Sequence, residues 1–253
     1  MAVHLHASVA PGDSSLERRL AAELEGDVLF DRWNRGLYST DASIYQIEPV
    51  GVVVPKSTDD IIRSVQIAED AGVPVLPRGA GTSQCGQTVG AAIVVDTSKY
   101  MDKVLALDPD AATVTVEPGV VLDQLNAALL RHGLHFPVDV SPANRATIGG
   151  MAGNNSCGAR SIRYGNMVHS VRAIDVVLAG GDQATFGVVP GDVSGLVGPV
   201  RYVELVKRMR ALHQREAGEI RQRFPKLLRR VGGYNIDTID AAGHNMAHLL
   251  VGA

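Results

Sequence analysis

The sequence has few cysteines and no pair spaced as Cys-x-x-Cys. A zinc ribbon or an iron–sulfur cluster built from ligands close in sequence is therefore not encoded. The two cysteines, Cys85 and Cys157, suit a reducing compartment, so the expected location is the cytoplasm. We interpret both as small loop residues and regard a redox role as the lesser alternative.

The sequence also lacks a long apolar run and a strong excess of charge. No apolar run is long enough to span a bilayer. The first ten residues lack the charged start and the long apolar core of a signal peptide. A formal charge of −3 gives no general attraction to nucleic acid or to membranes. We therefore expect no nucleic-acid partner.

One stretch departs from this balance. Residues 201–230 hold ten basic and three acidic side chains. A basic helical stretch can contact nucleic acid or lipid headgroups. Because the overall charge is mild, we favour a solvated pair of helices over residues 200–228, and peripheral membrane contact has no other support.

A glycine-rich loop is predicted over residues 77–90, between the apolar runs 73–76 and 91–95. Its glycines Gly79, Gly81 and Gly86 allow positive φ and close approach of a ligand. Side-chain donors accompany them at Arg78, Thr82 and Ser83. Backbone N–H groups curled in this way form an anion-binding nest, for which a phosphate is the expected guest.

The loop does not fit the common phosphate-binding motifs. Gly81 and Gly86 have the glycine spacing of a P-loop, but Gln87 and Thr88 follow and the lysine is absent. Gln84 stands where a dinucleotide fingerprint requires its third glycine. Taken alone, the loop is equally well interpreted as a turn that joins two strands.

A second unusual stretch covers residues 137–166 and is rich in glycine, asparagine and serine. It has little apolar periodicity, so we predict neither an ordinary core helix nor a strand there. A long irregular segment inside a compact domain is typically a binding loop.

The remaining pattern predicts alternating helices and strands. Helices are expected over residues 14–26, 57–71 and 121–132, and strands over residues 50–54, 73–76, 91–96, 103–108, 112–117, 171–179 and 183–186. Ser14 or Ser15 is the expected cap of the first helix, and Ser57 or Thr58 of the second. Ile61, Ile62, Val65 and Ala68 are expected to form the apolar face of the second helix, and Leu122, Leu125 and Leu129 that of the third. Because the order mixes a β-α-β unit with hairpins, the expected fold class is α+β.

Together the two stretches resemble the FAD-binding domain of the PCMH type, in the vanillyl-alcohol-oxidase superfamily. Within it they are most similar to FAD-linked D-2-hydroxy-acid dehydrogenases, the D-lactate, glycolate and D-2-hydroxyglutarate group. The resemblance covers about residues 38–252 and is closest to long bacterial members with an iron–sulfur region after the flavin part. It rests on Pro77-Arg78-Gly79-Ala80-Gly81-Thr82, Pro137-x-Asp139, Thr147-Ile148-Gly149-Gly150, Asn154 to Gly158, Tyr164-Gly165 and, further on, residues 229–235.

The resemblance implies a PCMH-type fold of two α+β subdomains with the flavin between them. It places an N-terminal helical segment at residues 1–45 and the FAD-binding domain at 46–253. The implied cofactor residues are Pro77, Arg78, Gly79, Ala80, Gly81, Thr82, Ser83, Gly86, Gln87, Pro137, Asp139, Ser141, Thr147, Ile148, Gly149, Gly150, Asn154, Gly158, Ser161, Tyr164, Gly165 and Ile174.

The implied reaction is oxidation of a small D-2-hydroxy acid to the 2-oxo acid, with hydride transfer to flavin N5. In this family the base, the carboxylate clamp and any metal come largely from a later substrate domain, so no catalytic residue and no metal site are assigned here. Two alternatives stay open. One is a non-catalytic flavin-binding subunit or fragment that needs a partner chain, and the other is a nucleotide-binding module without redox activity.

The resemblance also implies that the flavin is not covalently bound. Thr82 stands about where relatives that tether FAD carry a histidine, and Cys157 is offset from the usual cysteine position.

The C-terminal residues 248–253 are expected to form an apolar strand. In the family such a strand leads into a Gly-Ser-Glu-Gly-Thr-type segment and then the substrate and iron–sulfur regions, whereas Ala253 here replaces the serine. We expect a truncated product, an excised domain or part of a split enzyme. An unpaired strand edge would leave the cofactor cleft open, so the isolated chain is expected to bind FAD weakly or not at all.

His244 and His248 are four residues apart and would share a face if both lay on one helix. No cysteine or carboxylate set accompanies them. An i, i+4 pair alone is a weak metal motif, so a structural role is favoured.

Overall fold

The computed structural model describes residues 9–227 and 229–253. The expected N-terminal segment 1–45 therefore begins outside the described residues, and its boundary at residue 45 remains a prediction. The chain forms two compact units. Unit 1 contains the chain up to Leu134 together with Asn144–Gly150 and Ala179–Gly181. Unit 2 contains His135–Ala143, Met151–Leu178 and Asp182–Ala253.

Unit 1 is built on a four-stranded sheet in the order β1-β2-β4-β3. The strands are β1 (Asp27–Leu29), β2 (Gly51–Val54), β3 (Val75–Arg78) and β4 (Ile93–Asp96). β4 is parallel to both β2 and β3, whereas β1 is antiparallel to β2. The strands expected at 50–54, 73–76 and 91–96 are confirmed, but β3 continues through Pro77 and Arg78, so the glycine-rich loop begins only at Gly79.

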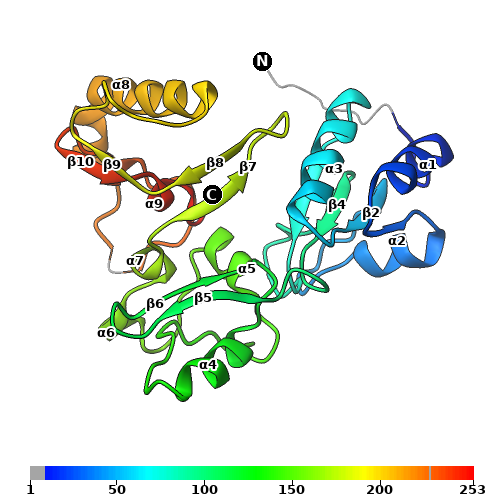
Figure 1. The fold of residues 1–253 in the computed structure, drawn as a ribbon, viewed down its shortest axis with the longest axis horizontal. Helices are drawn as coiled ribbons and strands as arrows, with labels where there is room; N and C mark the ends of the chain where they lie inside the picture. The colour runs from blue at the N-terminus through cyan, green and yellow to red at the C-terminus, as the bar shows by residue number, and fades with distance from the viewer. Residues whose placement is uncertain (1–8, 228) are drawn as a thin grey trace. The chain divides into compact units, whose positions relative to one another are not determined.

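Alternate residues of this sheet enter two different apolar clusters. On one face, α1 (Ser14–Glu23) and α3 (Thr58–Asp70) pack against the sheet, as Figure 1 shows. Val53 and Val95 belong to that cluster. On the other face, Val52 and Val94 pack with Tyr38 at the end of α2 (Arg32–Tyr38). The sheet is therefore covered on both sides, as its β-branched sequence predicts.

The ends of the two sheet-covering helices show how local sequence starts them. Ser57 caps α3, as predicted, and its hydroxyl accepts a hydrogen bond from the Asp60 N–H at 3.2 Å. α1 is capped by Asp13 and not by a serine, because a carboxylate can accept from two N–H groups at once. The predicted inner face of α3 is wrong in part: its fully buried apolar residues are Ile67 and Ala68, whereas Ile61, Ile62 and Val65 are partly exposed.

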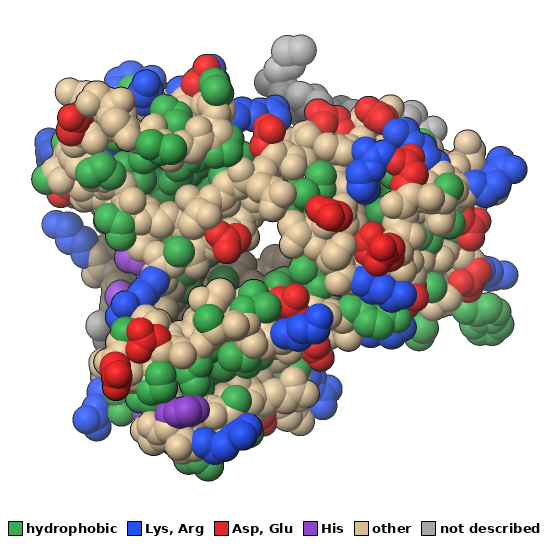
Figure 2. All heavy atoms as spheres, in the orientation of Figure 1, with side chains coloured by type: hydrophobic (Ala, Val, Ile, Leu, Met, Phe, Trp, Pro, Cys, Tyr) green, Lys and Arg blue, Asp and Glu red, His purple; other side chains and the backbone are tan. Residues whose placement is uncertain are grey.

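Unit 1 also contains an antiparallel hairpin and a helix. The hairpin joins β5 (Val104–Asp108) to β6 (Thr113–Val116), and the helix is α4 (Leu122–Leu130). Leu122, Leu125 and Leu129 are buried, which confirms the predicted inner face. Acidic and basic side chains are interspersed over α1 and α3 (Figure 2), so this face presents no field of a single sign.

Unit 2 contains two antiparallel strand pairs and a long helix. β7 (Ile174–Val177) pairs with β8 (Gln183–Phe186), and β9 (Val188–Pro190) pairs with β10 (Gly243–Asn245). The turn between β7 and β8 has positive φ at Gly180 and Gly181, as the hairpin prediction requires. The long helix α8 (Val200–Arg223) lies beside β9 and β10 (Figure 1). A single helix thus replaces the predicted pair.

Five shorter helices complete the described chain: α5 (Ile148–Gly153), α6 (Ser161–Tyr164), α7 (Met167–Ser170), the 3-10 helix η1 (Ile236–Thr238) and α9 (Met246–Leu250). Phe186, Val206 and Met246 are among the buried residues of the unit 2 core. Within residues 9–227 and 229–253, no helix combines the length and the apolar character needed to cross a membrane.

The predicted C-terminal strand is wrong. Residues 246–250 form α9, and the groups that follow are paired. The Gly252 N–H donates to the Ala152 carbonyl at 3.0 Å, and the Gly252 carbonyl accepts from the Gly233 N–H at 2.8 Å. The unpaired edge that would have weakened cofactor binding is therefore not formed there. A short apolar run fits a helix or a strand equally well, which explains the error.

Candidate functional site

The side chain of Arg78 holds the first loop in place. Its guanidinium donates to three backbone carbonyls, those of Tyr38 (3.2 Å), Thr88 (3.1 Å) and Thr40 (2.9 Å). It also lies over the ring of Tyr38, 5.1 Å from the centroid. Arg78 was expected to offer donors to a phosphate. Three of its five N–H donors thus shape the loop, and a contact between Arg78 and a phosphate stays a prediction.

The backbone of the same loop has free donors. No N–H of residues 79–84 donates a hydrogen bond to any group in the described part of the chain. Gly81 (φ +65°) and Gly86 (φ +78°) adopt the positive φ that was predicted. A run of N–H groups without protein acceptors, beside residues with positive φ, is the arrangement that binds anions.

Gly79 does not adopt the positive φ that was predicted for it, and its approach to a ligand stays a prediction. A Cβ at this position would lie 2.3 Å from the Thr147 hydroxyl oxygen. Only glycine allows this approach. Thr147 is itself buried, and it forms a bridge with Val121. The structure therefore brings the first loop and Thr147 together within unit 1.

The two glycines after Thr147 have different surroundings. A Cβ on Gly149 would lie 2.6 Å from the Cβ of Pro118. A Cβ on Gly150 would meet only the Thr147 hydroxyl, at 3.0 Å, and Gly150 is exposed. Packing inside unit 1 thus explains Gly149. No contact of this kind explains Gly150, and the predicted close approach of a ligand there stays a prediction.

Unit 2 gathers a second set of predicted residues around Asp139. The Asp139 carboxylate accepts from the Arg160 N–H at 3.0 and 3.2 Å. A Cβ on Gly158 would lie 1.9 Å from the Asp139 carbonyl oxygen, so only glycine fits. The Gly158 N–H donates to the Ser161 hydroxyl at 2.9 Å. Asp139, Gly158 and Ser161 therefore fix the path of the second loop.

The second loop is more regular than predicted. Two short helices, α5 and α6, occupy the stretch that was expected to be irregular, and α7 follows directly after it. They are only four to six residues long, too short for apolar periodicity to mark them. Gly165 (φ +80°) ends α6.

The other predicted residues of unit 2 are more dispersed. The ring of Tyr164 meets that of His135 edge to face, at 6.1 Å. Ile174 begins β7, opposite Phe186. Pro137 is half-buried and Ser141 is exposed. These positions remain predictions as cofactor contacts.

Sequence reasoning missed two buried asparagines of unit 2 as structural members of this site. Asn155 (1% exposed) and Asn166 (2% exposed) both donate to the carbonyl of Arg230, at 3.0 and 3.3 Å. Asn155 also accepts from the Val168 N–H at 3.0 Å and has a positive φ of 42°. The residue run Gly-Asn-Asn indicates positive φ in the sequence. The shared partner, Arg230, lies 75 residues from Asn155 and 64 from Asn166, so no local sequence pattern indicates these hydrogen bonds.

The paired-histidine interpretation is wrong in its premise. His244 lies in β10 and His248 in α9. The His248 Nε2 lies 3.1 Å from the Val171 carbonyl oxygen, and the His244 Nδ1 lies 3.1 Å from that of Asp240. In the described part of the chain, no group of three or more His, Cys, Asp or Glu side chains is placed to hold a metal ion.

We expect His244 to make unit 2 sensitive to acid. Burial lowers its pKa below the usual 6.5, and the charge of Arg210 acts in the same direction. The unfolded chain therefore takes up a proton on this histidine at a higher pH than the folded chain does. The contribution of neutral His244 to the free energy of unfolding should be fully present above pH 6.5 and should decrease below that pH, by at most about 1.4 kcal/mol per pH unit. Urea unfolding at pH 7.5 and 5.5 tests this. His244→Gln should reduce the pH dependence, and His132→Gln, at an exposed site, should not.

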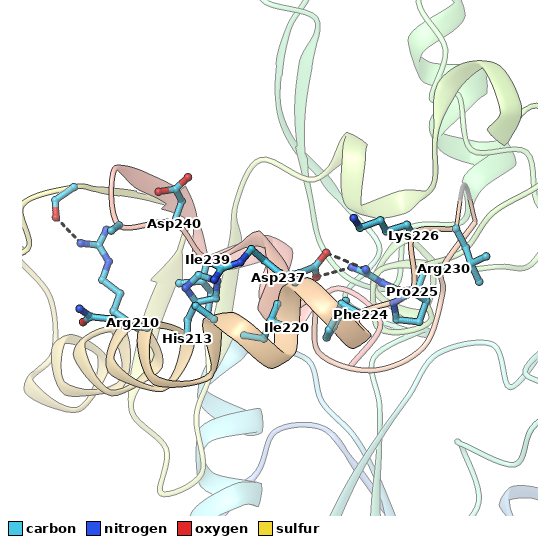
Figure 3. A pocket seen from close by; sticks show the side chains of 16 residues that line it. Arg210, His213, Ile220, Phe224, Pro225, Lys226, Arg230, Asp237, Ile239 and Asp240 are labelled. Carbon is cyan, nitrogen blue, oxygen red and sulfur yellow. Dashed lines mark hydrogen bonds and ion pairs between the residues drawn. The ribbon is translucent and has the colours of Figure 1, made fainter.

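Unit 2 also has a hollow of about 950 Å³ along α8. Ile220, Phe224 and Ile239 supply apolar side chains, and Arg230 and Asp237 form part of its wall (Figure 3). None of the predicted cofactor residues lines this hollow.

Comparisons with known proteins show what the chain is similar to. D-2-hydroxyglutarate dehydrogenase of Pseudomonas putida is 35% identical over 247 residues, covering 94% of this chain and 24% of that protein. Glycolate oxidase subunit GlcD of Bacillus subtilis is 38% identical over 180 residues, covering 68% of this chain and 38% of that protein. The chain thus spans about a quarter to two fifths of the length of these relatives.

Solved structures show the fold. A structure of alkyldihydroxyacetonephosphate synthase matches with a TM-score of 0.61 at 22% identity, over 73% of this chain and 36% of the other. A BBE-like 1 variant of Physcomitrella patens matches with a TM-score of 0.60 at 23% identity, over 68% and 37%. The α+β fold of the PCMH type is confirmed. Residues 49–187, more than half of the chain, match the family described as FAD binding domain, and the chain belongs to that family.

Proposed function

We propose that this chain is the FAD-binding part of a flavoprotein that oxidises a D-2-hydroxy acid to the 2-oxo acid. The observation that carries the proposal is the run of unpaired backbone N–H groups at residues 79–84, beside Thr147 and Gly150. Membership in the FAD-binding family and relatives described as D-2-hydroxyglutarate dehydrogenase and D-lactate dehydrogenase support it.

The residues present fit the chemistry of FAD. The pyrophosphate is a dianion that needs several donors and no bulky side chain. The unpaired N–H groups of residues 79–84 supply the donors, and the exposed Gly150 leaves room for close approach. Thr82 and Ser83 add hydroxyls, although the Ser83 hydroxyl already pairs with Gln87. The residues fixed by Asp139 in unit 2 are proposed as cofactor contacts from the family pattern alone.

Bound flavin would supply the redox chemistry by accepting a hydride. The contribution of this chain would be to bind and orient the cofactor. We assign no catalytic base and no carboxylate clamp to it. A second candidate is a flavin-binding subunit or fragment that works with a separate substrate-binding chain. If adding such a chain restored reduction of an artificial dye by a 2-hydroxy acid, that result would favour this candidate over the first.

The flavin should be held without a covalent bond. Thr82 lacks a nucleophile able to attach to the isoalloxazine ring, and the loop offers no histidine there. Acid precipitation of the FAD-loaded protein should leave the yellow colour in the supernatant. Colour that stays with the denatured pellet would contradict this and would direct attention to Cys85 or Cys157.

A further inference from the structure

Arg230 links the second loop of unit 2 to a segment well outside the predicted cofactor residues. Its carbonyl accepts hydrogen bonds from the side-chain amides of Asn155 (3.0 Å) and Asn166 (3.3 Å). Both asparagines are almost fully buried. An unpaired buried amide is costly, so these two side chains depend on where the Arg230 carbonyl lies.

The side chain of Arg230 in turn is fixed by three neighbours. It donates to both carboxylate oxygens of Asp237, at 2.9 and 2.7 Å, and to the Asn235 side-chain oxygen at 2.9 Å. It also lies over the ring of Phe224, 4.5 Å from the centroid. Figure 3 shows the guanidinium turned toward the Asp237 carboxylate at the wall of the hollow. A two-point contact of this kind fixes orientation as well as distance.

The chain of contacts reaches the backbone of the second loop. Asn155 accepts the Val168 N–H at 3.0 Å, which holds the start of α7. Ser156, next in sequence, accepts the Met167 N–H at 2.9 Å through its carbonyl. Displacement of Arg230 would therefore change the conformation of residues 155–168, which include Gly158, Ser161 and Tyr164.

We propose that Arg230, held by Asp237, is a positioning residue for the second cofactor loop. It sets the conformation of residues 155–168 through Asn155 and Asn166 without contacting the cofactor. The importance of this loop for FAD rests on the proposed function, whereas the positioning itself does not. Asp237 lies 69 or more residues beyond that loop in sequence, so its effect on flavin binding would be indirect.

The test uses Asp237→Asn in the full 253-residue chain. The amide keeps the shape of the side chain but removes the charge that orders the guanidinium. In the FAD-free protein, hydrogen exchange at the Val168 and Met167 amides should accelerate roughly 3- to 30-fold. Exchange at the Gly119 amide of unit 1, which donates to the Met101 carbonyl, should not change. The FAD dissociation constant, from flavin fluorescence, should rise by a similar factor.

Three further variants complete the design. Asp182→Asn removes an exposed carboxylate paired with Arg201 elsewhere in unit 2 and should leave all three amides unchanged. Asp237→Glu keeps the carboxylate and should restore most of the protection. If Asp237→Asn does not fold, Arg230→Lys gives the same readout, because lysine keeps the charge and loses the two-point contact.

The outcomes separate the two claims. Unchanged exchange at Val168 in Asp237→Asn would overturn the positioning role, as would equal acceleration at Gly119, which indicates general destabilisation. Faster exchange at Val168 with unchanged FAD affinity would overturn the link to the cofactor while leaving the contact network in place. A wild-type chain without FAD binding would contradict the proposed function alone, since the exchange experiment needs no flavin.

Discussion

Gly150→Leu should abolish FAD binding and leave the fold intact. Gly150 is exposed, and a Cβ there would meet only the Thr147 hydroxyl at 3.0 Å. It lies within α5, where replacing glycine also favours the helix. The added side chain would occupy the space in which we expect the cofactor. The dissociation constant should rise at least about 100-fold, which corresponds to roughly 2.7 kcal/mol.

Gly149→Ala is the matched control, one residue away in the same helix. Its Cβ would lie 2.6 Å from the Cβ of Pro118 and 3.0 Å from the Pro118 carbonyl oxygen. Overpacking of this kind should destabilise unit 1 by about 1–3 kcal/mol. Circular dichroism and urea unfolding should therefore separate the two variants: Gly150→Leu keeps stability and loses flavin. Normal flavin content in folded Gly150→Leu would show that the cofactor does not approach there.

The purified 253-residue chain should not oxidise D-lactate, glycolate or D-2-hydroxyglutarate at steady state. The sequence supports no assignment of a catalytic base or of a carboxylate clamp. The relatives share this chain over only a quarter to two fifths of their length. Turnover should fall below detection, against typical values of roughly 1–1000 per second for enzymes.

An artificial dye provides the assay, and dithionite provides the control. Reduction of the bound flavin by dithionite would show that the cofactor is present and competent, so that a missing rate reflects missing substrate groups. Steady dye reduction with any of the three acids would contradict this prediction. It would place catalytic groups among the residues assigned here to cofactor binding.

Features that depend only on neighbouring residues in the sequence were predicted best. The strand run at 50–54, the Ser57 cap and the inner leucines of α4 follow from local pattern, and the structure confirms them. Gly81 and Gly86 were also predicted correctly, since positive φ is a property of a single residue.

The reasons behind other glycines could not be predicted. A Cβ at Gly79 would clash with Thr147, one at Gly149 with Pro118, and one at Gly158 with Asp139. Each of these neighbours lies 19 or more residues away in the sequence. The three carbonyls that accept from Arg78 could not be predicted either, because nothing local in the sequence indicates them. The α9 helix was taken for a strand because its apolar run is too short to show a period.

Titration of the purified chain with FAD tests the central claim most directly. Because the groups at Gly252 are paired and do not form the open strand edge on which the expectation of weak binding rested, the account predicts saturable binding of one FAD per chain. Quenching of flavin fluorescence monitors the binding, and acid precipitation should release all the colour. The same titration with Gly150→Leu should show no saturation. Absence of saturable binding to a wild-type chain that is folded by circular dichroism, or equal binding to both proteins, would contradict the assignment of the two loops to the cofactor.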